Sequence, residues 1–252
     1  MRHVVHAVIF RELKTRFGDY RLGYLWLVLE PVSHLLVWMA VLGAASRHVI
    51  PGVDFPVFLA VGILPWIFIS NSISRSLTAV ESNSSLFTYR RVKPIDIMIA
   101  RVLIELVAVV MVGILLVSVA WLLGFKISVQ NGLLFVGYSF VTFFFTLALS
   151  MITGIAAVLI PSSKKIIPMI MRPFYFISAI MYPFAVVPQY KRHWLDWNPV
   201  LHIVELLRNA WFGPALKPTI TSWVYLLSVT LLIMAASLWL YRISERRLLT
   251  TV

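Results

Sequence analysis

Four titratable residues near the end of the chain have side chains suited to acid–base chemistry: His193, Asp196, His202 and Glu205. Carboxylates and imidazoles gathered at one membrane face could serve a transferase that acts on lipid-linked sugars. Glu205 also lies three residues before Arg208, a spacing at which opposite charges pair on one helix. A membrane-embedded transferase and a purely structural ion pair are therefore both open.

Two glycine spacings, Gly18–Gly23 and Gly132–Gly137, match the beginning of a phosphate-binding loop. The residues that follow them are Tyr24 and Tyr138, where such a loop needs lysine and then serine or threonine. The chain has no cysteine and no paired-histidine metal cluster. We expect no catalytic, cofactor-binding or metal site in this chain, so any step that needs ATP would take its energy from another polypeptide.

Two further pairs of ionisable residues have helical spacing inside apolar runs. Glu30 and His34 are four residues apart, and we expect a buried hydrogen bond between them rather than a proton-carrying site. Arg101 and Glu105 have the same spacing and could neutralise each other near the membrane interface.

The composition identifies an integral membrane protein. The 252 residues are 60% hydrophobic and 13% charged, whereas soluble domains average about 45–50% apolar and about 25% charged residues. The net charge of +12 is explained by basic loops at a membrane surface. We expect no nucleic-acid partner, because no basic patch lies away from the apolar runs.

A membrane span needs roughly 20 apolar residues. The long run Ile127–Ser163 has no polar turn in its middle, so we predict one tilted helix there, Gly132–Ile160. With it, the sequence predicts six transmembrane helices in an all-α fold: Leu22–Ser46, Phe55–Ser74, Val102–Phe125, Gly132–Ile160, Ile166–Val187 and Ile220–Tyr241.

Basic residues concentrate in alternate loops, which predicts that both termini are cytoplasmic. Of 22 Lys and Arg residues, 16 lie on the predicted cytoplasmic side. They are Arg2, Arg11, Lys14, Arg16, Arg21, Arg75, Arg90, Arg91, Lys93, Arg101, Lys164, Lys165, Arg172, Arg242, Arg246 and Arg247.

Two segments are unsuited to crossing the membrane. Residues 1–21 are too charged and predict an amphipathic helix in the interface plane, where Glu12 and Arg16 could meet a partner protein. Residues 183–214 predict a re-entrant or outer-face region, in which Asn198 caps and Pro199 opens a helix that stops at Gly213. That helix is too short to span. Its region also contains Trp194, Trp197, Glu205, Arg208 and Trp211. An aromatic belt resting on lipid headgroups is the alternative.

The basic segment 82–94 lies between two predicted spans and is long enough for a short cytoplasmic helix. We predict that it contacts a soluble motor subunit. Its apolar residues would enter a cleft of that partner and its basic residues would meet acidic groups: Leu86, Phe87, Tyr89, Arg90, Arg91 and Lys93.

Three motifs together resemble the permease subunit of ATP-binding-cassette polysaccharide exporters. They are RELKTRFGDYRLGYLWLVLEP (Arg11–Pro31), GILPWIFISNSISRS (Gly62–Ser76) and the YP…P…NP…RNAWFG string (Tyr182–Gly213). The stretch FYFISAIMYP is closer to capsule exporters than to O-antigen exporters. The resemblance covers essentially the whole chain, a single transmembrane permease domain over residues 1–252.

The resemblance implies an N-terminal interface helix, a cytoplasmic coupling helix at residues 82–94, and re-entrant helices before the sixth span. It further implies a homodimer in the bacterial inner membrane, two ATPase subunits that bind ATP and Mg²⁺, and a polysaccharide or glycolipid substrate, with periplasmic export components as further partners. Exporters of O-antigen, teichoic acid, small lipids or drugs share this architecture. Aromatic side chains could stack on sugar rings along the pathway. The candidates are Trp26, Trp38, Trp66, Tyr138, Tyr175 and Tyr182.

Overall fold

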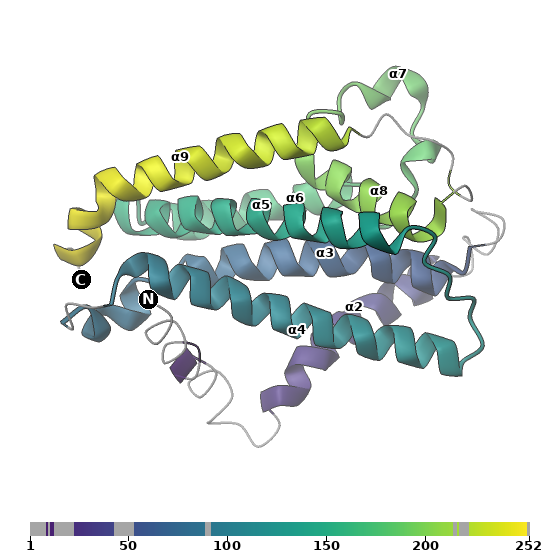
Figure 1. Cartoon of the computed structure of the whole chain (residues 1–252), viewed down its shortest axis with the longest axis horizontal. Helices are drawn as coiled ribbons and strands as arrows, with labels where there is room; N and C mark the ends of the chain where they lie inside the picture. Colours follow the sequence, from purple (N-terminus) through teal and green to yellow (C-terminus); the bar gives the residue numbers. More distant parts are fainter. Residues whose placement is uncertain are drawn as a thin grey trace.

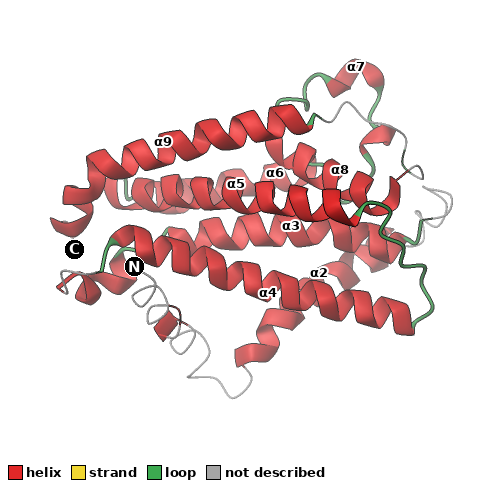
Figure 2. Ribbon diagram, in the orientation of Figure 1, coloured by secondary structure: helices red, strands yellow, loops and turns green. Residues whose placement is uncertain are grey.

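The computed structural model describes residues 9, 11–12, 23–42, 53–88, 92–213, 216 and 222–250. Within these ranges every regular element is helical (Figures 1 and 2). The elements are α2 (Gly23–Leu42), α3 (Phe55–Ser76), η1 (Glu81–Thr88), α4 (Pro94–Leu122), α5 (Gly132–Leu159), α6 (Ser163–Ile177), η2 (Phe184–Val186), α7 (Gln189–Arg192), α8 (Pro199–Phe212) and α9 (Trp223–Thr250).

In the part of the chain that the structure describes, four helices are long and apolar enough to cross a bilayer: α3, α4, α5 and α9. α2 has 20 residues, whereas α6 has 15 and is too short to span by itself. The all-helical membrane fold is confirmed, whereas the count of six spans stays a prediction. Figure 1 shows α3, α4, α5 and α9 running side by side along the long axis of the molecule.

Several predicted boundaries hold. The run before Ser163 forms one helix, α5, with 28 residues, as predicted. The short helix α8 begins at Pro199, is capped by Asn198 and ends before Gly213, whose φ of 56° suits a residue without a side chain. In the cap, the Asn198 side chain accepts a hydrogen bond from the Val200 amide at 3.0 Å.

Three boundaries differ from the prediction. α4 begins at Pro94 rather than Val102, because the Asp96 carboxylate accepts a hydrogen bond from the Lys93 amide and stabilises an earlier first turn. α6 ends at Ile177, well before the predicted Val187, and Ala179 follows with a φ of 53° that interrupts the helix. α9 continues past Tyr241 to Thr250.

The core forms where α3, α5 and α8 meet. α5 packs against α9, α3, α8 and α4, and α3 also contacts α8 and α4. Most of α3 and nearly all of α8 are buried, including Leu59, Ile69, Leu201 and Ile203. A second apolar cluster joins η1 to α4, α5 and α9 at one end of the bundle. α8 is therefore an internal element of the protein and not a loop that rests on its surface.

Candidate functional site

Arg101, near the start of α4, connects three other segments at the η1 end of the bundle. Its guanidinium donates to the Arg75 carbonyl at 2.5 Å and to Thr78 Oγ1 at 3.1 Å. It also donates to Ser82 Oγ at 2.6 Å and forms an ion pair with Glu12 at 3.0 Å. We call these residues the Arg101 cluster. The predicted pairing of Arg101 with Glu105 is wrong, because Glu12 and these oxygens take all the donors of the guanidinium.

Glu105 pairs instead with Arg75 at the end of α3, with Nε and Oε1 at 2.5 Å. The carboxylate is 2% exposed, whereas the Arg75 side chain is 38% exposed. Both residues line a small polar cavity of about 120 Å³ together with Glu12, Thr78 and Arg101. Two arginines and two carboxylates thus hold the ends of α3 and α4 together.

The predicted coupling segment contains the 3-10 helix η1, which is joined to the N-terminal segment by Asn83. The buried Asn83 amide donates to Glu12 Oε1 at 2.7 Å and to the Ala79 carbonyl at 3.0 Å, and its oxygen accepts from Arg11 at 2.9 Å. Lys164, at the start of α6, forms an ion pair with Glu81 of η1. A displacement of η1 would therefore reach the N-terminal segment and α6 directly.

The coupling residues predicted from sequence divide into three groups. Leu86 and Phe87 are half-buried against the apolar cluster beneath η1, so each keeps part of its surface free. Lys93 pairs with Glu245 of α9 at 2.9 Å and Glu12 pairs with Arg101 at 3.0 Å, so both are held within this chain. Four other predicted residues lie outside the described ranges: Arg16, Tyr89, Arg90 and Arg91.

Three of the aromatic residues predicted for a glycan pathway lie together between α2, α3 and α6. The Tyr175 ring lies 6.0 Å from the Trp38 ring and 5.5 Å from the Trp66 ring. Trp66 and Tyr175 are 6% and 7% exposed, so in this structure they pack inside the protomer. Of these three, the half-buried Trp38 is the one with the most free surface.

His34 lies beside this aromatic group and bonds to Tyr175, with Nε2 and the hydroxyl oxygen at 2.8 Å. The predicted hydrogen bond between His34 and Glu30 is wrong. Glu30 is exposed and accepts from the Asn71 amide at 3.4 Å. The hydroxyl of Tyr175 is the closer partner because α6 packs against α2 at this level.

The remaining pathway candidates lie apart from the aromatic group. Tyr138 on α5 is half-buried against the core. Tyr182 donates to the Phe176 carbonyl at 2.9 Å, and burial, together with the charge of Glu205, raises the pKa of the Tyr182 phenol. The side chain of Trp26 lies outside the described part of the structure.

Arg208 of α8 is fully buried and binds main-chain carbonyls of the segment that follows α6. Its guanidinium donates to the carbonyls of Ala179 at 2.7 Å, Ile180 at 2.5 Å and Tyr182 at 3.2 Å. It also pairs with Glu205 at 3.2 Å, as the spacing predicts, and lies 3.7 Å from the centre of the Phe58 ring. We call these residues the Arg208 cluster.

The sequence indicates the Glu205 pair but not the three carbonyls of the Arg208 cluster, because main-chain acceptors leave no mark in residue types. The same holds for the Arg75 carbonyl bound by Arg101. A faint signal exists for the partners Ser82 and Asn83, since short polar side chains in a turn often bond to the ends of neighbouring helices.

Two of the four acid–base residues considered for a transferase, His202 and Glu205, are engaged in structural bonds. His202 Nε2 donates to the Asp196 carbonyl at 2.7 Å, and its Nδ1 accepts from the Ser222 amide at 3.2 Å. Glu205 forms an ion pair with Arg208. Among the described residues no group of three His, Cys, Asp or Glu side chains could hold a metal ion. The geometry therefore does not favour a transferase.

The tryptophans of the 183–214 region differ in burial. Trp194 and Trp197 are 69% and 55% exposed, as expected of aromatic side chains at a membrane interface. Trp211 is buried against α5, with its ring 5.1 Å from that of Phe135. The buried Asn198 amide donates to Ser178 Oγ at 2.9 Å and thereby ties the start of α8 to the end of α6.

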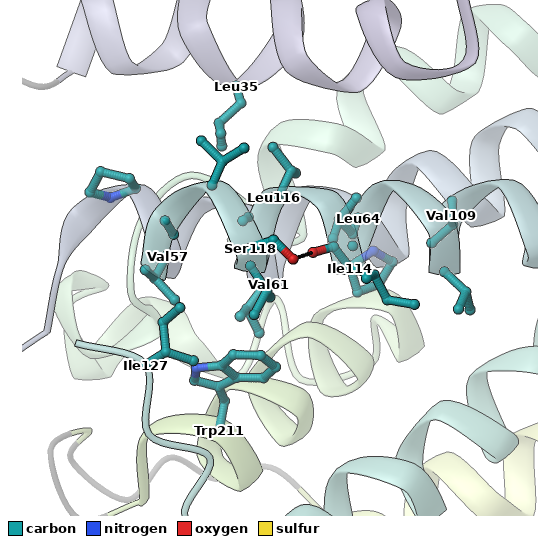
Figure 3. A pocket seen from close by; sticks show the side chains of 18 of the residues that line it. Leu35, Val57, Val61, Leu64, Val109, Ile114, Leu116, Ser118, Ile127 and Trp211 are labelled. Carbon is teal, nitrogen blue, oxygen red and sulfur yellow. Dashed lines mark hydrogen bonds between the residues drawn. The ribbon is translucent and has the colours of Figure 1, made fainter. Parts of the chain in front are cut away.

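A groove of about 610 Å³ opens between α2, α3 and α4 (Figure 3). Aliphatic side chains such as Leu35, Val61 and Ile114 form its walls. The Ser118 hydroxyl donates to the Ile114 carbonyl of its own helix at 2.8 Å. Because this hydrogen bond uses the hydroxyl proton, Ser118 adds little polarity to the groove. A sugar chain would lose hydrogen bonds to water here without replacement, so this groove is not a glycan site.

These features define a multi-pass, all-helical membrane protein whose polar side chains join helix ends. The family model described as ABC-2 type transporter matches residues 3–212, and the chain belongs to this family. Its similarity to the polysialic acid transport protein KpsM of Escherichia coli amounts to 39% identity over 98% of this chain and 95% of the relative. The capsule polysaccharide export inner-membrane protein CtrC of Neisseria meningitidis is 25% identical over 90% of this chain and 85% of its own length. The O-antigen export system permease protein RfbA of Myxococcus xanthus is 27% identical over 74% of this chain and 70% of its own length.

Proposed function

We propose that this chain is the permease subunit of an ATP-driven exporter that moves a lipid-linked capsular polysaccharide across the bacterial inner membrane. The observation that carries the proposal is the similarity to KpsM along nearly the entire chain. Export of O-antigen, teichoic acid, a smaller lipid or a drug through the same architecture is the alternative.

The conduit forms between two copies of the chain. One protomer packs its core tightly around α3, α5 and α8, and its large groove is apolar. A hydrated sugar chain therefore needs a polar space outside the protomer, which a homodimer with C2 symmetry would enclose. We place six spans in each protomer, with both termini in the cytoplasm, because this topology gives the bias of 16 of 22 basic residues.

Energy comes from two copies of a cytoplasmic ATPase that bind ATP and Mg²⁺. η1 is the element that contacts this partner, with the free surfaces of Leu86 and Phe87 entering a cleft of the ATPase. Closure of the ATPase dimer displaces η1, and the Arg101 cluster passes the displacement to α3, α4 and the N-terminal segment. The protomers then part, and the region around α7 and α8 opens the outer end of the conduit.

Reconstitution into liposomes tests the requirement for the ATPase. Vesicles that contain this chain and the ATPase should transport polysaccharide only with ATP and Mg²⁺, and vesicles with this chain alone should transport none. Transport at an equal rate without the ATPase would contradict the proposal.

A substitution in η1 tests the contact with the partner. Phe87→Ala should leave insertion and ATP hydrolysis intact but lower the amount of polymer moved per ATP hydrolysed, because the contact that transmits ATPase closure is weakened. Ser85→Ala, on an exposed position of the same element, is the matched control and should keep the coupling ratio of the original protein. If Phe87→Ala moved as much polymer per ATP hydrolysed as the original protein, Phe87 of η1 would not transmit ATPase closure.

A further inference from the structure

Arg172 lies deep within α6, far from the helix end where a basic residue normally meets the membrane surface. Eight residues separate it from Lys164, which pairs with η1, so it is about 12 Å along the helix from that end. Tyr175, one turn further on, contacts Trp66, the middle residue of the 22-residue helix α3. Measured along α3 from its end at Ser76, the level of Arg172 is therefore about 10 Å into the helix.

The Arg172 side chain is exposed, and it has no ionic partner in the described part of the chain. Nine of the ten acidic residues lie in the described ranges, and none forms an ion pair with it. The two arginines that are buried in the described part of the chain are neutralised: Arg101 by Glu12, and Arg208 by Glu205. Arg172 thus presents a positive charge on the outer face of the protomer.

The neighbours of Arg172 on the same face form one helical stripe. Lys165, Met169, Arg172 and Phe176 recur at spacings of four, three and four residues, and all four side chains are exposed. An arginine that faced hydrocarbon at this depth would be costly, so such residues face water-filled spaces or other protein. The stripe on α6 therefore faces water or another protein surface and not the acyl chains.

We propose that Arg172 binds the carboxylate or phosphate groups of the exported polymer, which makes the substrate an anionic polysaccharide. This inference rests on the proposed function. A guanidinium offers paired donors to a carboxylate or a phosphate, and the aromatic ring of Phe176, one turn away, can stack on a sugar. Two copies related by C2 symmetry would place two such arginines along one pathway.

The absence of cysteine from the chain makes an accessibility experiment direct. Arg172→Cys introduces a single thiol, which is treated in the assembled exporter with membrane-impermeant methanethiosulfonate reagents. Leu232→Cys is the matched control, because Leu232 of α9 is 70% exposed on an apolar surface. We expect the thiol at position 172 to react and the thiol at position 232 to stay unmodified.

Export then reports on the charge. Arg172→Cys should lower export of the polymer about tenfold or more, the loss expected for a charge-assisted hydrogen bond. A reagent that attaches an ammonium group should restore export, and one that attaches a sulfonate should not. Arg172→Lys should retain most export and Arg172→Gln should not, which provides the same comparison if the cysteine variant fails to insert.

The polymer class is tested with the unsubstituted exporter in nanodiscs. Polysialic acid, which bears a carboxylate on each sugar, should stimulate ATP hydrolysis, and neutral dextran of equal length should not. An exporter that moves polymer but has an unreactive thiol at position 172, or that works equally with Arg172→Gln, overturns this inference and leaves the proposed function standing. Absence of ATP-dependent export by the unsubstituted protein would instead overturn the proposed function.

Discussion

Gly62→Ala is the substitution whose effect the structure specifies most closely. A Cβ atom added to Gly62 of α3 would lie 2.3 Å from Arg208 Nη2 and 2.6 Å from the Ile180 carbonyl oxygen. Both distances are shorter than any ordinary contact. Arg208 has little freedom to withdraw, because its guanidinium binds three carbonyls and lies on the Phe58 ring. Accommodation of the methyl group therefore requires α3 to move away from α8 and Arg208 to give up its hydrogen bond to the Ile180 carbonyl.

The expected loss of stability follows from two contributions. Overpacking of a core by one methyl group costs about 1–3 kcal/mol, and loss of a hydrogen bond to a charged group costs about 1.5–3 kcal/mol. The higher helix propensity of alanine returns about 1 kcal/mol. The free energy of unfolding should thus fall by about 3 kcal/mol, which for a chain of this size lowers the Tm by about 10 °C.

Thermal unfolding of the purified protein in detergent, followed by circular dichroism at one fixed scan rate, measures this change. Gly113→Ala is the matched control on α4, where the added Cβ meets only Leu64 Cδ1 at 3.5 Å. The control should match or slightly exceed the Tm of the unsubstituted protein. If Gly62→Ala were as stable as Gly113→Ala, the tight contact between α3 and Arg208 would be refuted.

A double-mutant cycle attributes the effect to Arg208. Arg208→Lys shortens the side chain and leaves room beside Gly62. The two substitutions together should therefore destabilise the protein by less than the sum of the separate losses. Strict additivity would mean that the methyl group clashes with the Ile180 carbonyl alone.

Three other substitutions are predicted from measured contacts. Arg101→Lys should cost about 2–4 kcal/mol of stability, since an ammonium group cannot reach Glu12 and three further oxygens together, and denaturant titration would detect it. Asn198→Ala should cost about 1–2 kcal/mol through loss of the helix cap, measured in the same way. Lys93→Ala should change stability by less than about 1 kcal/mol, because its pair with Glu245 is exposed, and a larger loss would show that the pair is not solvent-screened.

The sequence was sufficient to predict the elements whose signals are local. Hydrophobic length predicts α5 as one helix, and the Asn198–Pro199 pair predicts the start of α8. The i,i+3 spacing predicts the bond between Glu205 and Arg208. In each case the residues that determine the structure are neighbours along the chain, so no knowledge of the packing is needed.

Long-range partners were not predictable in this way. Arg101 has a carboxylate four residues away, yet it binds Glu12, which is 89 residues distant in sequence. The end of α6 was placed too late because an apolar run continues through Ala179, while buried carbonyls at the turn are satisfied by Arg208. Apolar composition specifies burial but not which main-chain groups leave the helix.

For the aromatic candidates, too, residue type did not predict where the side chain lies. Trp66 and Tyr175 have residue types suited to sugar stacking, and the structure buries both in contact with each other. Charge counting puts Arg172 on the cytoplasmic side, whereas in the structure it lies nine residues after the start of α6 at Ser163. For both sets, depth and facing direction depend on how α6 packs against α2 and α3, which periodicity alone does not give.

The two arginine clusters together determine which helices can move as one body. Apolar side chains gain little by contact with other helices in a bilayer, since lipid tails are equally apolar, so polar bonds contribute to fixing the relative positions of helices. The Arg101 cluster joins α4 to the end of α3, and the Arg208 cluster joins α8 to the first half of α3. Separation of α3 from α4 would leave a donor of the Arg101 guanidinium unfilled, and separation of α3 from α8 would remove the Phe58 ring from the Arg208 guanidinium. A conformational change during transport should therefore carry α3, α4 and α8 together and place its hinges elsewhere.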